Sequence, residues 1–217
     1  MEKKQSITAA VVVAHPDDET LWAGGTILMH PEWQWTVVSL CRRSDPDRQP
    51  RFLRATQALG AAGVMGDLDD GPEQLPLPET QMQQELLSLL PPEHFNFVLT
   101  HSSYGEYTRH RRHEETSRTV IALWEEGLIR TGEVWMFAYE DSGKGGRDDP
   151  PRAIKTAHLV VQLPDDIWRE KYRTITEIYG FAPESYEAGI TPRQEAFWCF
   201  HYPSEFRKWL EGGRRER

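Results

Sequence analysis

The chain has 217 residues, of which 38% are hydrophobic and 27% charged, a composition typical of a globular, soluble protein rather than a disordered one. The formal net charge of -9 argues against general nucleic-acid binding, which needs a positive surface. No apolar run approaches the roughly 18 residues that a membrane-spanning helix requires.

The N-terminal residues, the cysteines and the chain length indicate the compartment and the number of domains. Residues 1–6 carry charges and no apolar segment follows them, so we expect no secretory signal and a cytoplasmic protein. Two cysteines, Cys41 and Cys199, occur without a C-x-x-C pair, which disfavours a disulfide framework and a thiolate zinc site. The length suits one large domain over residues 1–217.

The first predicted element is a buried strand at residues 11–13, because three consecutive valines pack well in a pleated sheet. Pro16 ends this strand, since proline cannot donate a hydrogen bond to the sheet. One imidazole and three carboxylates surround that proline: His15, Asp17, Asp18 and Glu19. Ligands of α/β proteins bind beyond the carboxyl ends of the strands, so this stretch is a candidate site.

Helices and strands then alternate along the chain. Hydrophobic patterns predict helices at 21–29, 51–60, 81–90, 114–129, 167–179 and 203–210, and strands at 35–40, 95–100, 134–139 and 157–163. Residues 67–78 and 142–147 are rich in turn formers and are expected to be loops. This alternation predicts an α/β fold with a mostly parallel sheet, to which the last third adds an antiparallel edge.

A second polar cluster follows the strand predicted at 95–100, and it contains His101, His110 and His113. Parallel strands bring their carboxyl ends to one edge of the sheet, so the two clusters are expected to meet there. His15 and Asp18, with one histidine of the second cluster, form a set that leaves positions open for water and substrate, as a catalytic zinc requires. Of the two adjacent aspartates, one can bind the metal while the other takes a proton from the attacking water.

The residues of these clusters carry a family resemblance. The stretch Ala14-His15-Pro16-Asp17-Asp18-Glu19 resembles the A-H-P-D-D-E signature of the PIG-L/LmbE-like zinc N-deacetylases. Gly105-Glu106-Tyr107, followed by His110-x-x-His113, is similar to the second motif of that family. The spacing of strands and helices agrees with that family over residues 1–140. The resemblance implies a Rossmann-like three-layer fold and a zinc-dependent hydrolase that removes an acetyl group from an N-acetylated sugar-type substrate, such as GlcNAc or its conjugate.

The resemblance also implies roles for single residues. His15, Asp18 and His113 would bind Zn²⁺, or another divalent metal, and Asp17 would be the general base. His110 would polarise the carbonyl group or protonate the leaving amine.

Several alternatives remain for these positions. For the third ligand, His113 is preferred over His110 because it lies nearest to the start of a helix, where a side chain is better fixed, and His101 is a further candidate. Asp17 can instead orient His15 without acting as a base. Glu19 is expected to support the site or the helix start rather than to bind the metal.

Arginines form the next group of candidates. By its offset in the helix predicted at 51–60, Arg51 matches a substrate-contacting arginine of the family better than Arg54 does. Arg109, Arg111 and Arg112 fit either solvated ion pairs with nearby glutamates or recognition of a phosphate or carboxylate on the substrate.

Two features depart from the family pattern. The family usually has Gly-His-Pro-Asp-His after the tyrosine, whereas residues 108–113 read Thr-Arg-His-Arg-Arg-His, with one extra residue and with Arg112 in place of a carboxylate. The family's C-terminal pattern, K-x-x-A followed by H-x-S-Q, is not recognisable in residues 171–186.

Two other functions compete with the deacetylase. His15, Asp17 and His113 also satisfy the H-x-D…H facial triad of non-haem Fe(II) oxygenases, which normally lies on an all-β fold. A catalytically inactive binding module of the same fold is the other alternative. No G-x-S-x-G elbow supports a serine hydrolase. The expected partner is a small N-acetylated sugar or conjugate, and a homo-oligomer is left open.

Overall fold

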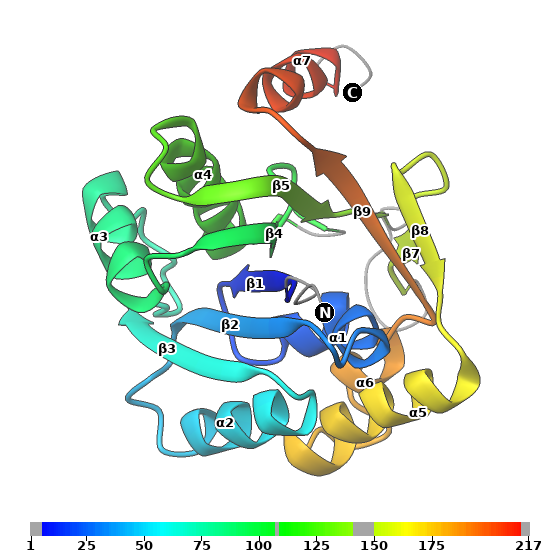
Figure 1. Ribbon diagram of the computed structural model, residues 1–217. Helices are drawn as coiled ribbons and strands as arrows, with labels where there is room; N and C mark the ends of the chain where they lie inside the picture. Colours follow the sequence, from blue (N-terminus) through cyan, green and yellow to red (C-terminus); the bar gives the residue numbers. More distant parts are fainter. Residues whose placement is uncertain (1–5, 107–108, 141–149, 214–217) are drawn as a thin grey trace, which may run out of the picture.

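The computed structural model describes residues 6–106, 109–140 and 150–213 (Figure 1). One sheet comprises the strands β1 (Thr8–Val13), β2 (Gln34–Cys41), β3 (Ala62–Leu68), β4 (His94–Thr100), β5 (Arg130–Phe137), β8 (Leu159–Gln162) and β9 (Gln194–Phe200). A separate pair consists of β6 (Tyr139–Glu140) and β7 (Arg152–Ala153). The large sheet has the order β3-β2-β1-β4-β5-β9-β8. β1 to β5 are parallel, while β9 and β8 are antiparallel.

Helices cover both faces of this sheet. They are α1 (Asp18–Met29), α2 (Arg48–Ala58), α3 (Glu79–Leu89), α4 (Arg111–Glu125), α5 (Asp165–Arg173), the π-helical turn η1 (Thr174–Ile178), α6 (Tyr186–Ile190) and α7 (Pro203–Gly213). α1, α2, α5 and α6 lie on one face, and α3, α4 and α7 lie on the other (Figure 1). The result is the predicted Rossmann-like three-layer fold. No helix in the described segments is long and apolar enough to cross a bilayer.

β1 occupies the middle of the sheet and explains where the site lies. Val11 faces one hydrophobic core and Val12 faces the other, so the strand is apolar on both sides, as a central parallel strand must be. From β1 the chain crosses first to β2 and β3 on one side, and later to β4 and β5 on the other. The carboxyl ends of β1 and β4 therefore form the topological switch point, where α/β proteins bind ligands.

Most of the predicted elements are present, and the antiparallel edge of the last third is confirmed. β3 and β9 were not predicted. β3 contains Gly63 and Gly66, which weaken a strand signal. Both glycines allow close packing: a Cβ on Gly63 would clash with Thr56 Oγ1, and one on Gly66 would lie 2.5 Å from Glu85 Oε1. The loop predicted at 142–147 lies outside the described residues.

Candidate metal centre

Three side chains converge at the carboxyl ends of β1 and β4. His15 lies in the loop after β1, Asp18 begins α1, and His113 lies in the first turn of α4. His15 Nδ1 is 3.1 Å from His113 Nε2 and 3.2 Å from Asp18 Oδ2. His113 Nε2 is 3.3 Å from the same carboxylate oxygen. The structure thus brings together the three residues that the sequence singled out as ligands.

Hydrogen bonds at the far side of each imidazole determine which nitrogens face inward. His15 Nε2 lies 3.1 Å from Asp70 Oδ1, and His113 Nδ1 lies 2.7 Å from Glu106 Oε2. Each of these nitrogens donates its proton to the carboxylate, so in the neutral form of either ring it is the inward nitrogen that carries the lone pair. In that form two lone pairs and a carboxylate oxygen face one another, an arrangement that suits a positive charge, either a proton on an imidazole or a metal ion.

The donor set fits zinc. Two imidazole nitrogens and one carboxylate oxygen are typical of a catalytic zinc site with an open position. Bonds of about 2.0–2.1 Å at tetrahedral angles place ligand atoms about 3.3 Å apart, which matches the separations of 3.1, 3.2 and 3.3 Å in this triangle. The carboxylates behind both imidazoles are the partners that metal-bound histidines usually have.

His101 lies close to this triangle, but its nitrogens are already engaged. Its Nδ1 is 2.8 Å from Glu106 Oε1, and its Nε2 accepts a hydrogen bond of 3.0 Å from the backbone N–H of Ala14. The ring is fully buried and stacks on His113 with centroids 3.9 Å apart. With both nitrogens engaged, His101 packs beneath the site and supplies no free lone pair.

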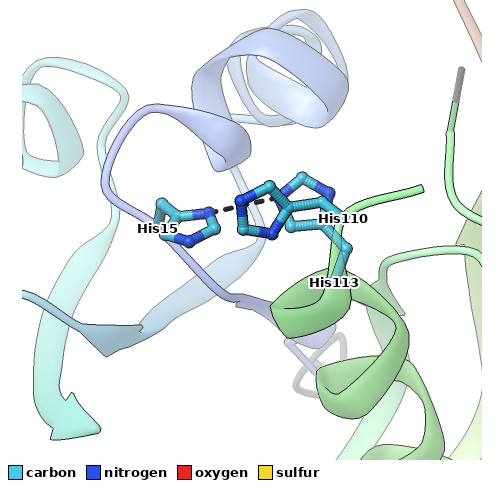
Figure 2. Close-up of side chains that lie close together, drawn as sticks. All are labelled: His15, His110 and His113. Carbon is cyan, nitrogen blue, oxygen red and sulfur yellow. Dashed lines mark hydrogen bonds between the residues drawn. The ribbon is translucent and has the colours of Figure 1, made fainter. Parts of the chain in front are cut away.

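His110 stands at the other side of the triangle. It immediately precedes α4, and its ring centroid lies 4.7 Å from those of both His15 and His113 (Figure 2). His110 Nδ1 is buried and makes no hydrogen bond within the described residues. An unpaired buried nitrogen is costly unless a ligand or water satisfies it, so His110 is available to a molecule bound beside the metal position.

Asp17 lies next to the triangle in a strained backbone conformation. Its φ is 110° and its ψ is -31°, a combination that costs a residue other than glycine about 1–3 kcal/mol and that clusters at functional sites. The side chain lines a cavity of about 300 Å³. The other residues that line it are His15, Pro16, Arg42, Arg48, Asp70 and His110. Asp17 therefore borders the space where a substrate could lie without joining the triangle.

Charges around the triangle favour a cation. Burial alone would raise the pKa of Asp18, but His113 and His101 hold that pKa well below its usual range. In the same way, His101 and His113 outweigh burial and lower the pKa of Glu106. Both carboxylates are therefore ionised. Although burial acts against it, these two carboxylates also raise the pKa of His113 well above its usual value.

Two neighbouring groups titrate differently. Burial, together with His113 and His15, lowers the pKa of His110 to about 4. Burial, Asp18 and Glu19 raise the pKa of Asp17 well above its usual range, against the effect of Arg48.

The arginine that approaches Asp17 is not the one singled out by the sequence. Arg48 Nη1 lies 3.8 Å from Asp17 Oδ2 and the side chain lines the cavity. Arg51, one turn later in α2, pairs with Asp47 at 2.8 Å and donates to the carbonyl of Tyr179. Arg51 is not among the residues that line the cavity, and its substrate contact stays a prediction.

The three arginines near α4 have separate roles. Arg109 is exposed and pairs with Glu114 at 2.7 Å, as expected of a solvated ion pair, and Arg111 is also exposed. Arg112 is fully buried. It donates to the carbonyl oxygens of Asp69 at 2.6 Å and Leu75 at 2.9 Å. Arg112 therefore holds the segment that carries Asp70 against α4.

Sequence reasoning missed four residues that build this site. Asp70 and Glu106 orient the two histidines, and Arg42 and Arg48 line the cavity. Glu106 was visible as part of the second motif, but nothing in the motif gave it a role. Asp70 has no local signal, because its partner His15 lies 55 positions away in the sequence.

The model of the PIG-L family, described as GlcNAc-PI de-N-acetylase, matches residues 10–124. An uncharacterized protein of Acanthamoeba polyphaga mimivirus, L374, is 23% identical over 180 residues, which cover 76% of this chain and 75% of that protein.

Two solved structures share the fold. GalB, the 4-carboxy-2-hydroxymuconate hydratase of Pseudomonas putida KT2440, has a TM-score of 0.61 and 17% identity, with 89% of this chain and 95% of that one covered. The N,N'-diacetylchitobiose deacetylase of Pyrococcus horikoshii has a TM-score of 0.58 and 16% identity, covering 91% and 85%.

Proposed function

Since the chain belongs to the PIG-L family of GlcNAc-PI de-N-acetylases, we propose that it is a metal-dependent N-deacetylase acting on an N-acetylated sugar-type substrate. The observation that carries this proposal is the triangle of His15, Asp18 and His113, beside a cavity that Asp17 lines. The diacetylchitobiose deacetylase that shares the fold supports the same substrate class.

The metal would be zinc, held by His15 Nδ1, Asp18 Oδ2 and His113 Nε2. When bound, it supplies a Lewis acid that polarises the amide carbonyl and lowers the pKa of water. Asp70 and Glu106 fix the orientation of the two imidazoles through the hydrogen bonds behind them.

Asp17 would act as the general base. It accepts one proton from water as the water oxygen adds to the carbonyl carbon of the acetamide. The C–N bond then breaks, the leaving nitrogen takes from Asp17 the proton that came from water, and the products are a free amine and acetic acid, which ionises to acetate. Arg48, 3.8 Å from the Asp17 carboxylate, keeps a positive charge beside the base.

His110 and the cavity arginines would hold the substrate. The unpaired Nδ1 of His110 can form a hydrogen bond with the carbonyl oxygen or the leaving nitrogen. Arg42 and Arg48 line the same cavity and can donate hydrogen bonds to sugar hydroxyl groups. Arg109, Arg111 and Arg112 are not among the residues that line this cavity.

The test is an assay of amine and acetate release over N-acetylated sugars and their conjugates, with zinc-loaded protein. We expect equimolar amine and acetate from at least one substrate. Asp17→Asn should keep the metal and lower kcat by about 100-fold or more. A hydratase shares this fold, so the fold alone does not identify the reaction. The assay must therefore detect both amine and acetate, the two products of deacetylation. Full activity of Asp17→Asn would remove the base assignment, and metal-loaded protein without turnover on any substrate would favour a non-catalytic binding module.

The Fe(II) oxygenase alternative gains no support. The facial triad requires Asp17 as the carboxylate ligand, whereas Asp18 contacts both imidazoles. The chain also forms an α/β fold rather than the all-β fold on which that triad normally lies.

A further inference from the structure

A segment of the last third of the chain lies directly behind Asp17. Tyr179 follows η1, outside the part of the chain that matches the family model. Its side chain is 2% exposed, and its hydroxyl group donates a hydrogen bond of 2.6 Å to Glu19 Oε1. The phenol therefore reaches into the loop that carries the proposed base.

Glu19 links the Tyr179 hydroxyl group to the backbone of Asp17 by hydrogen bonds to both. Its side chain is fully buried, and its second oxygen, Oε2, accepts the backbone N–H of Asp17 at 3.0 Å. The Thr20 hydroxyl donates to Oε1 at 2.6 Å. One buried carboxylate thus connects Tyr179 to the peptide group that must hold Asp17 in its strained conformation.

That conformation needs a support. A residue other than glycine with φ near 110° persists only where its surroundings hold it in place. The hydrogen bond from the Asp17 N–H to Glu19 supplies such a restraint. A carboxylate that accepts several well-aligned donors is itself rigid, and the Tyr179 hydroxyl is the donor that comes from a distant element.

Tyr179 is in turn anchored by its backbone. Its carbonyl oxygen accepts a hydrogen bond from Arg51 of α2, and its N–H donates to Thr174 at 3.0 Å, within the π-helical turn. Such turns frequently occur at functional sites. Two residues later, the Phe181 ring packs 4.9 Å below the guanidinium of Arg48. The segment 179–181 therefore contacts both Glu19, which holds Asp17, and Arg48, which pairs with it.

We propose that Tyr179 is a positioning residue for the general base: through Glu19, its hydroxyl group holds the backbone of Asp17 in the conformation that directs the carboxylate into the cavity. The effect on catalysis rests on the proposed deacetylase function, whereas the effect on the Asp17 backbone does not. This role also gives the last third of the chain a part in the site.

Tyr179→Phe tests the proposal, because it removes only the hydroxyl group and keeps the ring. We expect kcat to fall by about tenfold or more, while KM and bound zinc stay unchanged. Tyr139→Phe is the matched control. Tyr139 is 3% exposed, and its hydroxyl donates to the carbonyls of Trp22 and Gln194 at 3.4 Å, not to Glu19. This variant should keep the parent kcat.

A second measurement does not depend on activity. In Tyr179→Phe the backbone amide of Asp17, followed by NMR hydrogen exchange, should exchange faster than in the parent and in Tyr139→Phe. In a Glu19→Gln background, Tyr179→Phe should change kcat by less than about twofold, since the two residues act through one contact.

These outcomes separate the two proposals. An unchanged Asp17 exchange rate in Tyr179→Phe would overturn the positioning role, whatever the activity. Parent-like kcat in Tyr179→Phe, or an equal loss in Tyr139→Phe, would overturn it as well. If the parent protein releases no amine from any substrate while Asp17 exchange rises in Tyr179→Phe, the deacetylase proposal fails and the structural part of this one stands.

Discussion

Asp70 decides which nitrogen of His15 faces the metal position. Its Oδ1 accepts the Nε2 proton of His15 at 3.1 Å, and the carboxylate is itself held by Arg42 at 2.6 Å and Gln74 at 2.8 Å. Without this carboxylate, either ring nitrogen can carry the proton, and part of the protein would present an N–H to the metal.

Asp70→Asn should therefore weaken zinc binding by about 10–100-fold, measured by competition with a chromophoric chelator. Asp69→Asn is the control, because the Asp69 carboxylate is next in sequence but is 63% exposed and does not contact His15. Equal zinc affinities for the two variants would show that Asp70 does not orient the ligand.

Cys41 carries a pH-dependent contribution to stability. Its thiol is buried at 1% exposure and is free, and burial together with Asp70 raises its pKa from 9.0 to about 12. A raised pKa means that the folded state favours the neutral thiol. The stabilisation is thus complete below pH 9 and is lost as pH rises from 9 toward 12.

The free energy of unfolding should accordingly decrease more steeply between pH 9 and pH 12 in the parent than in Cys41→Ala, as measured by urea denaturation. At pH 8 the native thiol should resist alkylation by iodoacetamide, because the thiolate is the reactive form. Identical pH slopes for the two proteins, or rapid alkylation of native Cys41, would contradict this account.

At the scale of elements, one buried ion pair ties α5 and β9 to α1. Lys171 Nζ lies 2.7 Å from Glu195 Oε1, and both side chains are fully buried. The Glu195 carboxylate also accepts the backbone N–H groups of Gly25 and Thr26 at 2.7 Å each. Removing the lysine would leave a buried carboxylate without a counter-charge.

Lys171→Met should lower the free energy of unfolding by about 3–5 kcal/mol, read from urea denaturation. Arg173→Met, on the same helix, is the control: its side chain is 60% exposed, so its ion pairs should contribute only about 0–1 kcal/mol. Comparable losses in both variants would mean that the buried pair is not what joins these elements.

The site residues could be predicted from the sequence where the ends of the strands and helices were predicted correctly. β1 was predictable because a central parallel strand must be apolar on both faces, and the residues after it followed. β3 was not predicted because its glycines weaken the strand pattern. Without the end of β3 at Leu68, nothing in the sequence placed Asp70 at the same sheet edge as His15.

Arg48 and Arg51 of α2 show how the predicted end of an element determines which residue is selected. The helix was predicted to begin at residue 51, whereas α2 begins at Arg48, and its first turn is the part that borders the cavity. The predicted helix thus began one turn late, and the arginine that lines the cavity, Arg48, lay outside it. The contact between Tyr179 and Glu19 spans 160 positions, and no local pattern encodes a pairing over such a separation.

At the scale of the whole molecule, the candidate centre joins segments that are far apart in the chain. The loop after β1, the segment after β3 that carries Asp70, and the start of α4 meet only in the folded protein. An unfolded chain cannot bring these side chains together, so a metal bound at the proposed centre would stabilise the native state by mass action. At a free metal concentration 100 times Kd, this contribution is about 2.7 kcal/mol.

Zinc should therefore raise the Tm of the metal-stripped protein by about 5–10 °C, since 1 kcal/mol corresponds to about 2–4 °C at this chain length. Differential scanning calorimetry with zinc and then with excess chelator measures this shift. His113→Ala should show none, because it removes a ligand, whereas His110→Ala should keep it, because His110 borders the triangle without completing it. The reverse pattern would assign the third ligand to His110, and an equal shift in both variants would place the zinc elsewhere in the molecule.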